Sequence, residues 1–224
     1  MHVTIHYFVY PSSMAFLRLR SLFCAWLAVL GMAAAAFAQD NAPAILVVGD
    51  SISAGYGLPG GKVWVDLLTQ RLKENGYRYR VVNASISGDT TAGGRARLAP
   101  LLHQHKPAIV IVELGGNDAL RGGRLSTARD NLDAMVATAQ GAGAKVLLVG
   151  MQLPPNYGPA YVKEFGDLFA SVAKARKVSA VPYFFAGFGE DLAFFQPDRI
   201  HPTVDAQPKL LDNVWPALQP LLKK

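Results

Sequence analysis

The sequence predicts an α/β fold, a three-layer α/β/α sandwich in which helices cover both faces of a five-stranded parallel sheet. Short apolar runs rich in β-branched residues alternate along the chain with longer segments whose apolar residues recur every three or four positions. This is the pattern of strands alternating with amphipathic helices. No repeat or low-complexity linker interrupts the alternation. Right-handed crossovers would therefore place all the strands in one parallel sheet.

Five short runs are predicted to be strands. The first, residues 45–48, is wholly apolar, is too short for a helix and leads directly into Gly49, which is typical of a strand buried on both faces. The other four runs are residues 79–82, 109–114, 145–149 and 180–182. Polar, glycine-containing turns follow the first three strands, at the sheet edge where open α/β proteins bind ligands.

Five longer segments are predicted to be helices. Pro100 is expected to bend or break the second of them, and Pro216 to kink or end the last. Asp205 is expected to cap the last helix, with Pro208 in its first turn. The segments are residues 63–75, 92–105, 125–139, 161–177 and the stretch that follows Asp205.

The N-terminal region has the pattern of a targeting segment. Arg18 and Arg20 precede an apolar stretch, and small residues follow it up to Ala38, the order found in a secretory signal. We expect cleavage after Ala38, so that residues 1–38 are an extension with a signal peptide and residues 39–224 form one domain. A membrane anchor is the alternative, but no basic flank follows the apolar stretch. We expect export to the periplasm, with secretion into the medium as the alternative, and no stable membrane insertion after cleavage.

Composition narrows the class of protein further. Charged residues make up 17% of the chain and apolar residues 51%, which excludes a disordered protein. The single cysteine, Cys24, lies in the expected signal, so the mature chain cannot form a disulfide. Met14 is a plausible true start, because residues 1–13 do not suit a signal.

Two of the 22 Lys and Arg residues and none of the 16 acids precede residue 39, which leaves residues 39–224 with a net charge of +4. The basic residues are scattered, which argues against a nucleic-acid partner.

Three strand-end turns and one C-terminal motif carry reactive groups. Ser51, Gly88 and Asn117 follow the first three strands, and a parallel sheet places these turns on one edge. Asp198 precedes His201 by three residues, a spacing that lets one turn hold the carboxylate against the imidazole Nδ1. The Nε2 atom is then free to deprotonate a hydroxyl.

At these motifs the chain resembles the SGNH (GDSL-type) hydrolases. The blocks occur in the family's order: Gly49-Asp-Ser-Ile-Ser53, Gly88, Gly115-Gly-Asn-Asp118 and Asp198-x-x-His201. Longer stretches, such as 84–90, 112–118 and 153–158, are similar to the bacterial periplasmic thioesterase I/lysophospholipase L1/arylesterase branch. The resemblance covers residues 44–222 and implies a flavodoxin-like fold. Ile52, where the family usually has leucine, is a conservative departure.

The resemblance implies a role for each motif residue. Ser51 would be the nucleophile, His201 its base, and Asp198 the group that orients His201. The backbone N–H groups of Ser51 and Gly88 and the side-chain amide of Asn117 would form the oxyanion hole. Substrates would be small acyl esters, thioesters or lysophospholipids, and the protein a monomer.

The resemblance also places the substrate between two loops. Leu120 and Arg121 would belong to a loop that closes over an acyl chain, and Pro154, Asn156 and Tyr157 would line the other side. Two ordinary surface loops are the alternative interpretation.

Several other residues have structural interpretations. Ser53 could cap the turn after the first strand, and Ser85 and Ser87 are expected to order the loop of Gly88. Asp50 and Asp118 are expected to accept hydrogen bonds within their turns. Residues 54–61 lack the spacing of a phosphate-binding loop, and no histidine cluster suggests a metal, so we expect no cofactor and no metal.

Two other functions remain open from the sequence. The first is an SGNH carbohydrate acetylesterase or acyltransferase, which would use the same triad but need aromatic platforms for sugars. Trp64 is the only tryptophan near Ser51 in sequence, and its helical context suggests the core. The second is a non-catalytic lipid-binding module, which would not require a nucleophile–base pair.

Overall fold

The computed structural model describes residues 1–4, 42–60 and 62–224, so the expected signal peptide lies outside the described residues. The chain divides into two units, Met1–Ala42 and Pro43–Lys224. All the helices and strands of the described residues belong to the second unit. None of the described helices is both long enough and apolar enough to cross a bilayer.

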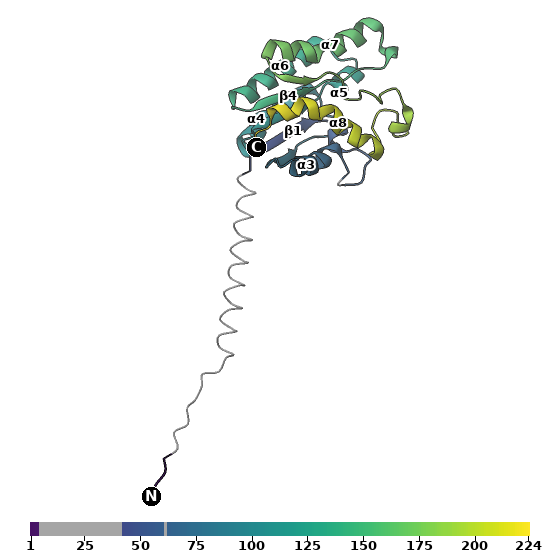
Figure 1. The fold of residues 1–224 in the computed structure, drawn as a ribbon. Helices are drawn as coiled ribbons and strands as arrows, with labels where there is room; N and C mark the ends of the chain where they lie inside the picture. The colour runs from purple at the N-terminus through teal and green to yellow at the C-terminus, as the bar shows by residue number, and fades with distance from the viewer. Residues whose placement is uncertain (5–41, 61) are drawn as a thin grey trace. The chain divides into compact units, whose positions relative to one another are not determined.

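The second unit is built on one parallel sheet of five strands (Figure 1). The strand order is β2-β1-β3-β4-β5, and every neighbouring pair is parallel. All five predicted strands are present, within two residues of their predicted bounds. They are β1 (Ala44–Gly49), β2 (Arg80–Asn83), β3 (Ile109–Glu113), β4 (Lys145–Val149) and β5 (Ser179–Val181).

The five predicted helices cover the two faces of this sheet, which confirms the three-layer sandwich (Figure 1). On one face α3 (Trp64–Glu74) packs against α8 (Gln207–Leu218). On the other face α6 packs between α4 and α7. These three helices are α4 (Thr91–His105), α6 (Leu125–Gly141) and α7 (Pro159–Arg176).

Short helices fill the turns and loops around the sheet. α2 (Ser51–Ala54) follows β1, and α5 (Gly116–Leu120) follows β3. Four 3-10 helices lie in the later connections, namely η1 (Pro155–Tyr157), η2 (Leu192–Phe194), η3 (Val204–Ala206) and η4 (Gln219–Leu221).

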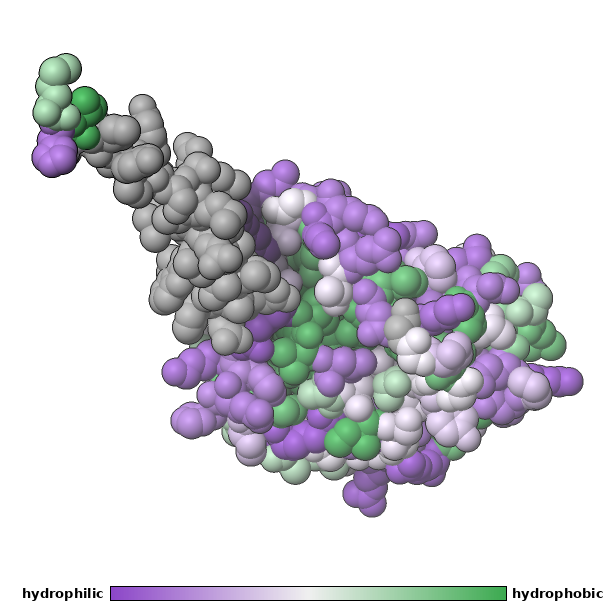
Figure 2. All heavy atoms as spheres, turned by 90° about the horizontal axis from the view of Figure 1, so that it is seen from below, coloured by the Kyte–Doolittle hydropathy of each residue, from purple (hydrophilic) through white to green (hydrophobic). Residues whose placement is uncertain are grey.

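The sheet is the centre of the hydrophobic core. Every residue of β1 and β3 is buried, as expected for strands covered on both faces. Four large aromatic side chains, including Trp64, are fully buried. Outside the core, Figure 2 shows a face of the molecule on which hydrophilic side chains surround a smaller area of apolar ones.

The expected cap of the last helix is wrong, and of the two effects expected of Pro216, a kink or an end, the structure excludes the end. Asp205 does not cap it, because Asp205 lies in η3 and α8 begins at Gln207 without a side-chain cap. Pro216 does not end the helix, which continues to Leu218. Val214 and Leu218 are both fully buried, so core packing holds the helix on either side of the hydrogen bond that proline cannot make. Pro208 lies in the first turn, as predicted.

The strand order determines where a site can form. The chain runs from β1 outward to β2 on one side, then returns to place β3 on the other side of β1. The carboxyl ends of β1 and β3 therefore diverge at a topological switch point, where open α/β folds have a crevice. Asp50 and Ser51 leave β1 at this point, and residues 115–117 leave β3 beside them.

Candidate active site

Ser51 is the first residue of α2, directly after the buried strand β1. Asp50 caps this short helix by accepting a hydrogen bond from the Ile52 backbone N–H at 3.0 Å. The Ser51 hydroxyl oxygen lies 2.8 Å from His201 Nε2. Strand, cap and helix together hold the serine at the sheet edge, facing an imidazole that comes from 150 residues further along the chain.

His201 is oriented by Asp198 through a local turn. The imidazole Nδ1 lies 2.7 Å from Asp198 Oδ2. The other carboxylate oxygen accepts hydrogen bonds from the backbone N–H groups of Ile200 and His201 at 2.9 and 3.0 Å. Partial burial acts to raise the pKa of Asp198, but these N–H groups and the imidazole lower it to about 2. Asp198 is therefore an ionised carboxylate that holds a proton on Nδ1 and leaves Nε2 to accept one.

Two further groups contact the His201 segment. The Tyr56 ring lies against the imidazole, with ring centroids 4.5 Å apart. The Gln196 side-chain amide donates to the Tyr56 carbonyl at 2.8 Å and to the Pro202 carbonyl at 3.2 Å, joining the loop after α2 to the loop of the histidine.

The expected oxyanion groups lie on neighbouring turns. Asn117 is in α5 and donates one hydrogen bond from Nδ2 to Asp50 Oδ2 at 3.1 Å. Its amide has a second N–H, which this contact does not use. Gly88 has a φ of 78°, a conformation that glycine adopts without steric cost. Its carbonyl accepts a hydrogen bond from the Arg121 guanidinium at 3.0 Å.

Both aspartates accept hydrogen bonds, but only Asp50 accepts one within its own turn, as predicted. Asp50 accepts from Ile52 and Asn117, as described above. Asp118 accepts from the Thr91 backbone N–H at 2.9 Å and from its hydroxyl at 2.7 Å, which ties the Asn117 turn to the start of α4.

The predicted roles of two serines are wrong. Ser53 does not cap a turn, because its hydroxyl donates to the buried carboxyl of Glu113 at 2.7 Å. The Ser85 hydroxyl does not order the Gly88 loop, since it is buried without a hydrogen-bond partner among the described residues. A serine at a turn could not be distinguished by sequence from one that reaches a neighbouring strand.

A cleft of about 1110 Å³ opens at the Ser51–His201 pair. Asn117 lines it together with both residues of the pair. Of the expected substrate residues, Leu120 and Pro154 also line it. Arg121, Asn156 and Tyr157 are not among its lining residues. The Tyr157 hydroxyl instead lies 3.4 Å from the Leu120 carbonyl, so it contacts the loop that carries Leu120.

Much of the cleft wall was not predicted. Its apolar side chains include several aromatic residues between β5 and α8 that pack on one another: Tyr183, Phe185, Phe188 and Phe195. The sequence feature that could have indicated this wall is the high density of aromatic residues over 183–195. Without regular periodicity, that segment could not be assigned to a face of the fold.

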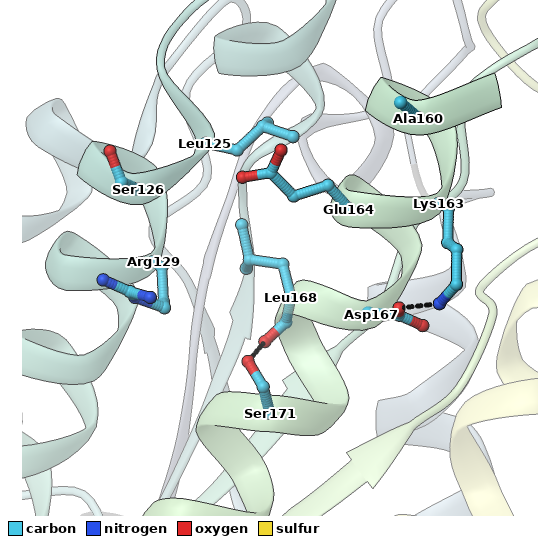
Figure 3. Close-up of a pocket in the computed structure, with 9 residues that line it drawn as sticks. All are labelled: Leu125, Ser126, Arg129, Ala160, Lys163, Glu164, Asp167, Leu168 and Ser171. Carbon is cyan, nitrogen blue, oxygen red and sulfur yellow. Dashed lines mark hydrogen bonds and ion pairs between the residues drawn. The ribbon is translucent and has the colours of Figure 1, made fainter. Parts of the chain in front are cut away.

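A second, smaller hollow of about 490 Å³ lies between α6 and α7 (Figure 3). Leu125 and Leu168 are among its lining residues, with charged side chains around them. The Ser171 hydroxyl donates to the Leu168 carbonyl at 2.7 Å, and Lys163 pairs with Asp167. No histidine lines the hollow. Within the described part of the chain, no group of three or more His, Cys, Asp or Glu side chains is placed to hold a metal.

The chain is similar in sequence to known proteins. A model of the "GDSL-like Lipase/Acylhydrolase family" matches residues 47–207. The esterase TesA of Pseudomonas aeruginosa is 55% identical over 184 residues, covering 82% of this chain and 92% of TesA. The thioesterase 1/protease 1/lysophospholipase L1 of Escherichia coli K12 is 40% identical over 186 residues, covering 83% and 88% of the two chains.

A solved structure shares the fold. The esterase EstA from Pseudoalteromonas, crystallised with monoethylphosphonate as inhibitor, is 36% identical and aligns with a TM-score of 0.75. The alignment covers 79% of this chain and 97% of EstA.

Proposed function

The chain belongs to the GDSL-like lipase/acylhydrolase family, and we propose that it hydrolyses carboxylic esters and thioesters with Ser51 as nucleophile. The observation that carries the proposal is the continuous contact from Ser51 Oγ to His201 Nε2 at 2.8 Å and from His201 Nδ1 to Asp198 at 2.7 Å. A serine hydroxyl is a weak nucleophile until a base removes its proton, and this contact supplies the base.

The proposed reaction has two steps. Ser51 Oγ attacks the acyl carbonyl as His201 Nε2 takes the hydroxyl proton, and His201 then gives that proton to the leaving alcohol or thiol. Water next attacks the acyl-enzyme, with His201 again acting as base and then returning the proton to Ser51. Asp198 stays ionised throughout and stabilises the imidazolium that forms in each step.

The negative charge on the carbonyl oxygen needs donors in both steps. We assign these to the backbone N–H groups of Ser51 and Gly88 and to the second N–H of the Asn117 amide. Asn117 supports this role because its other N–H is held by Asp50, which restricts the side chain to one orientation. Loss of one such donor costs about 3 kcal/mol in the transition state.

The wall of the cleft favours an apolar acyl or aryl group. Phe165, Leu153 and Met151 are buried and line it beside the aromatic residues 183–195. The names of the relatives describe an esterase and a thioesterase/lysophospholipase, and we propose the same substrate classes here. Leu120 and Pro154 would contact the acyl chain, while Arg121, Asn156 and Tyr157 would act by holding the adjacent loops.

Export is a further part of the proposal and rests on the sequence of residues 14–38. Acyl-coenzyme A esters are cytosolic, so an exported enzyme would meet lysophospholipids and other acyl esters outside the inner membrane. Thioester hydrolysis would then be an activity of the site and not its main task in the cell.

The test is hydrolysis of p-nitrophenyl acyl esters of increasing chain length by residues 39–224, beside Ser51→Ala. The wild type should turn over the longer esters best, and Ser51→Ala should lose at least about 10⁴-fold in kcat. Equal activity in both proteins would overturn the assignment of Ser51. A preference for acetyl esters would instead support the carbohydrate acetylesterase. Binding of lipid without turnover in a folded wild type would support the non-catalytic module.

A further inference from the structure

The mechanism above does not use Glu113. Its buried carboxyl contacts Asp50 and Ser53, which lie on either side of Ser51. Glu113 ends β3, and in the parallel register its partner on β1 is Gly49. Its side chain is fully buried, and its carboxyl accepts two hydrogen bonds, both on Oε2. Within the described residues, Oε1 has no partner. A buried carboxyl without a basic partner is costly, so its presence needs an explanation.

The two donors to Glu113 lie on either side of the nucleophile. The Asp50 backbone N–H, one residue before Ser51, donates at 3.3 Å. The Ser53 hydroxyl, two residues after Ser51, donates at 2.7 Å. One carboxyl oxygen therefore holds both ends of the turn in which Ser51 lies.

The direction of the Ser53 hydrogen bond is set by Trp64. The indole Nε1–H of Trp64 donates to Ser53 Oγ at 3.1 Å. Since an indole nitrogen can only donate, Ser53 accepts there and its own proton points to Glu113. Trp64 and Ser53 are both fully buried, so water does not compete for these bonds. The chain of contacts thus runs from the core helix α3 to the backbone at the nucleophile.

The space around Gly49 is shaped to admit this carboxyl. A Cβ atom at Gly49 would lie 2.8 Å from Glu113 Oε2 and 2.8 Å from Ser53 Cβ. The absence of a side chain at Gly49 is what lets the carboxyl of Glu113 reach across β1 to the turn.

We propose that Glu113 is a positioning residue for the hydrolysis: by holding Asp50 and Ser53 on one oxygen, it fixes the Ser51 hydroxyl and N–H relative to His201. This rests on the proposed function, because it assigns Ser51 as nucleophile. The protein gains a preorganised turn at the cost of burying a carboxyl.

Both hydrogen bonds that Glu113 accepts come from neutral donors, the Asp50 backbone N–H and the Ser53 hydroxyl. Burial, together with the nearby carboxyl of Asp50, raises its pKa well above the ordinary value. What the turn requires is then an oxygen acceptor and not a charge. A glutamine, which presents an amide oxygen on the same framework, should fill this role, whereas a leucine of similar size should not.

The experiment compares the kcat and KM of four variants with wild type on one p-nitrophenyl ester. Glu113→Leu and Ser53→Ala should lose about 10- to 100-fold in kcat, since small displacements of a nucleophile are costly. Their KM should stay within about threefold, because the cleft is unchanged. Glu113→Gln should stay within about fivefold of wild-type kcat. Leu102→Ala, a buried position near the end of α4 remote from Ser51, controls for lost stability.

A fluorophosphonate that labels Ser51 gives a second readout. Its labelling rate should fall with kcat in Glu113→Leu and Ser53→Ala. Unchanged kcat and labelling in folded variants would overturn the proposal, as would a loss in Glu113→Gln equal to that in Glu113→Leu. An equal loss in Leu102→Ala at matched thermal stability would also overturn it. If Glu113→Leu does not fold, the kcat and labelling rate of Ser53→Ala decide between support for the proposal and its rejection. Wild type inactive toward both ester and fluorophosphonate would count against the proposed function itself.

Discussion

Ser51 lies in the turn at the end of the buried strand β1, whereas Asp198 and His201 lie on a loop, residues 183–203, none of which belongs to the sheet. The turn, residues 49–53, is held by buried groups distant in sequence, Glu113 above all. The part of the loop that carries the two residues, 196–203, is held mainly by short-range contacts, such as the bond from the Gln196 N–H to the His201 carbonyl at 2.7 Å and the Asp198 turn. One half of the site is therefore fixed by the core, and the other by local chain geometry.

The two aspartates show the consequence for charge. Asp50, in the turn, is 3% exposed, and burial raises its pKa to about 6 despite the hydrogen bond from Ile52. The side chain of Asp198, on the loop, is 37% exposed and has a pKa of about 2. The same residue type is thus used as a structural acceptor on one side and as a permanent anion on the other.

The largest effect should come from reversing the hydrogen bond to His201. In Asp198→Asn, the amide oxygen can still accept the backbone N–H groups, but its NH₂ would donate to Nδ1. The imidazole would then carry its proton on Nε2 and could not accept the one from Ser51. We expect kcat to fall on the order of 10²- to 10⁴-fold with the loop intact.

The matched control for this prediction is Asp198→Ala, which also removes the turn. Because the amide enforces the wrong tautomer, Asp198→Asn should be no more active than Asp198→Ala. Steady-state kinetics of both variants check this. Higher activity in the asparagine variant would mean that loop geometry, and not the tautomer, is the main contribution of Asp198.

Two glycine substitutions should destabilise the protein to different extents, one in the turn and one on the loop. Gly49→Ala places a methyl group against Glu113 and Ser53 in the core and should lower the free energy of unfolding by about 3 kcal/mol. Gly187→Ala, on the loop, meets open space at a φ of 79° and should cost only about 1 kcal/mol from the backbone. Urea denaturation of both variants measures the difference. Equal costs would contradict the contrast between a packed turn and a locally held loop.

The sequence predicts the parts of the site that depend on local rules. All five strands follow from short apolar runs, and Ser51 and Asn117 follow from the rule that strand ends meet at one edge. Asp198 and His201 lie three residues apart, so their contact needs no knowledge of the fold. The Ser51–His201 contact spans 150 residues. It was predicted from the resemblance of the motifs to those of a family, because neither spacing nor hydrophobic periodicity indicates it.

The parts that were missed depend on register and on packing without periodicity. Glu113 ends an apolar run, and only the pairing of Gly49 with Glu113 shows that it faces Ser53, 60 residues away. The aromatic wall of the cleft comes from an irregular segment. The Asp205 cap fails because a 3-10 turn precedes α8, and sequence signals do not separate such a turn from a helix start.

The smallest effect should be in the pH dependence of stability, where the two aspartates have opposite signs. The pKa of Asp50 is raised from 3.8 to about 6, so its contribution to stability is present below pH 3.8 and lost as pH rises through 6. The pKa of Asp198 is lowered to about 2, so its contribution is present above pH 3.8 and lost as pH falls through 2.

Thermal unfolding of wild type, Asp50→Asn and Asp198→Asn between pH 2 and pH 7 tests this. Asp50→Asn should remove a decline in Tm between about pH 4 and 6, and Asp198→Asn a decline between about pH 4 and 2. The lost contact between Asp50 and Asn117 shifts the whole Asp50→Asn curve, so the comparison uses slopes and not absolute Tm values. The Asp198 slope should be the shallower one, because solvent screens a partly exposed carboxylate. A steeper slope from Asp198 than from Asp50 would mean that the loop, and not the buried turn, contributes more of the pH-dependent stability.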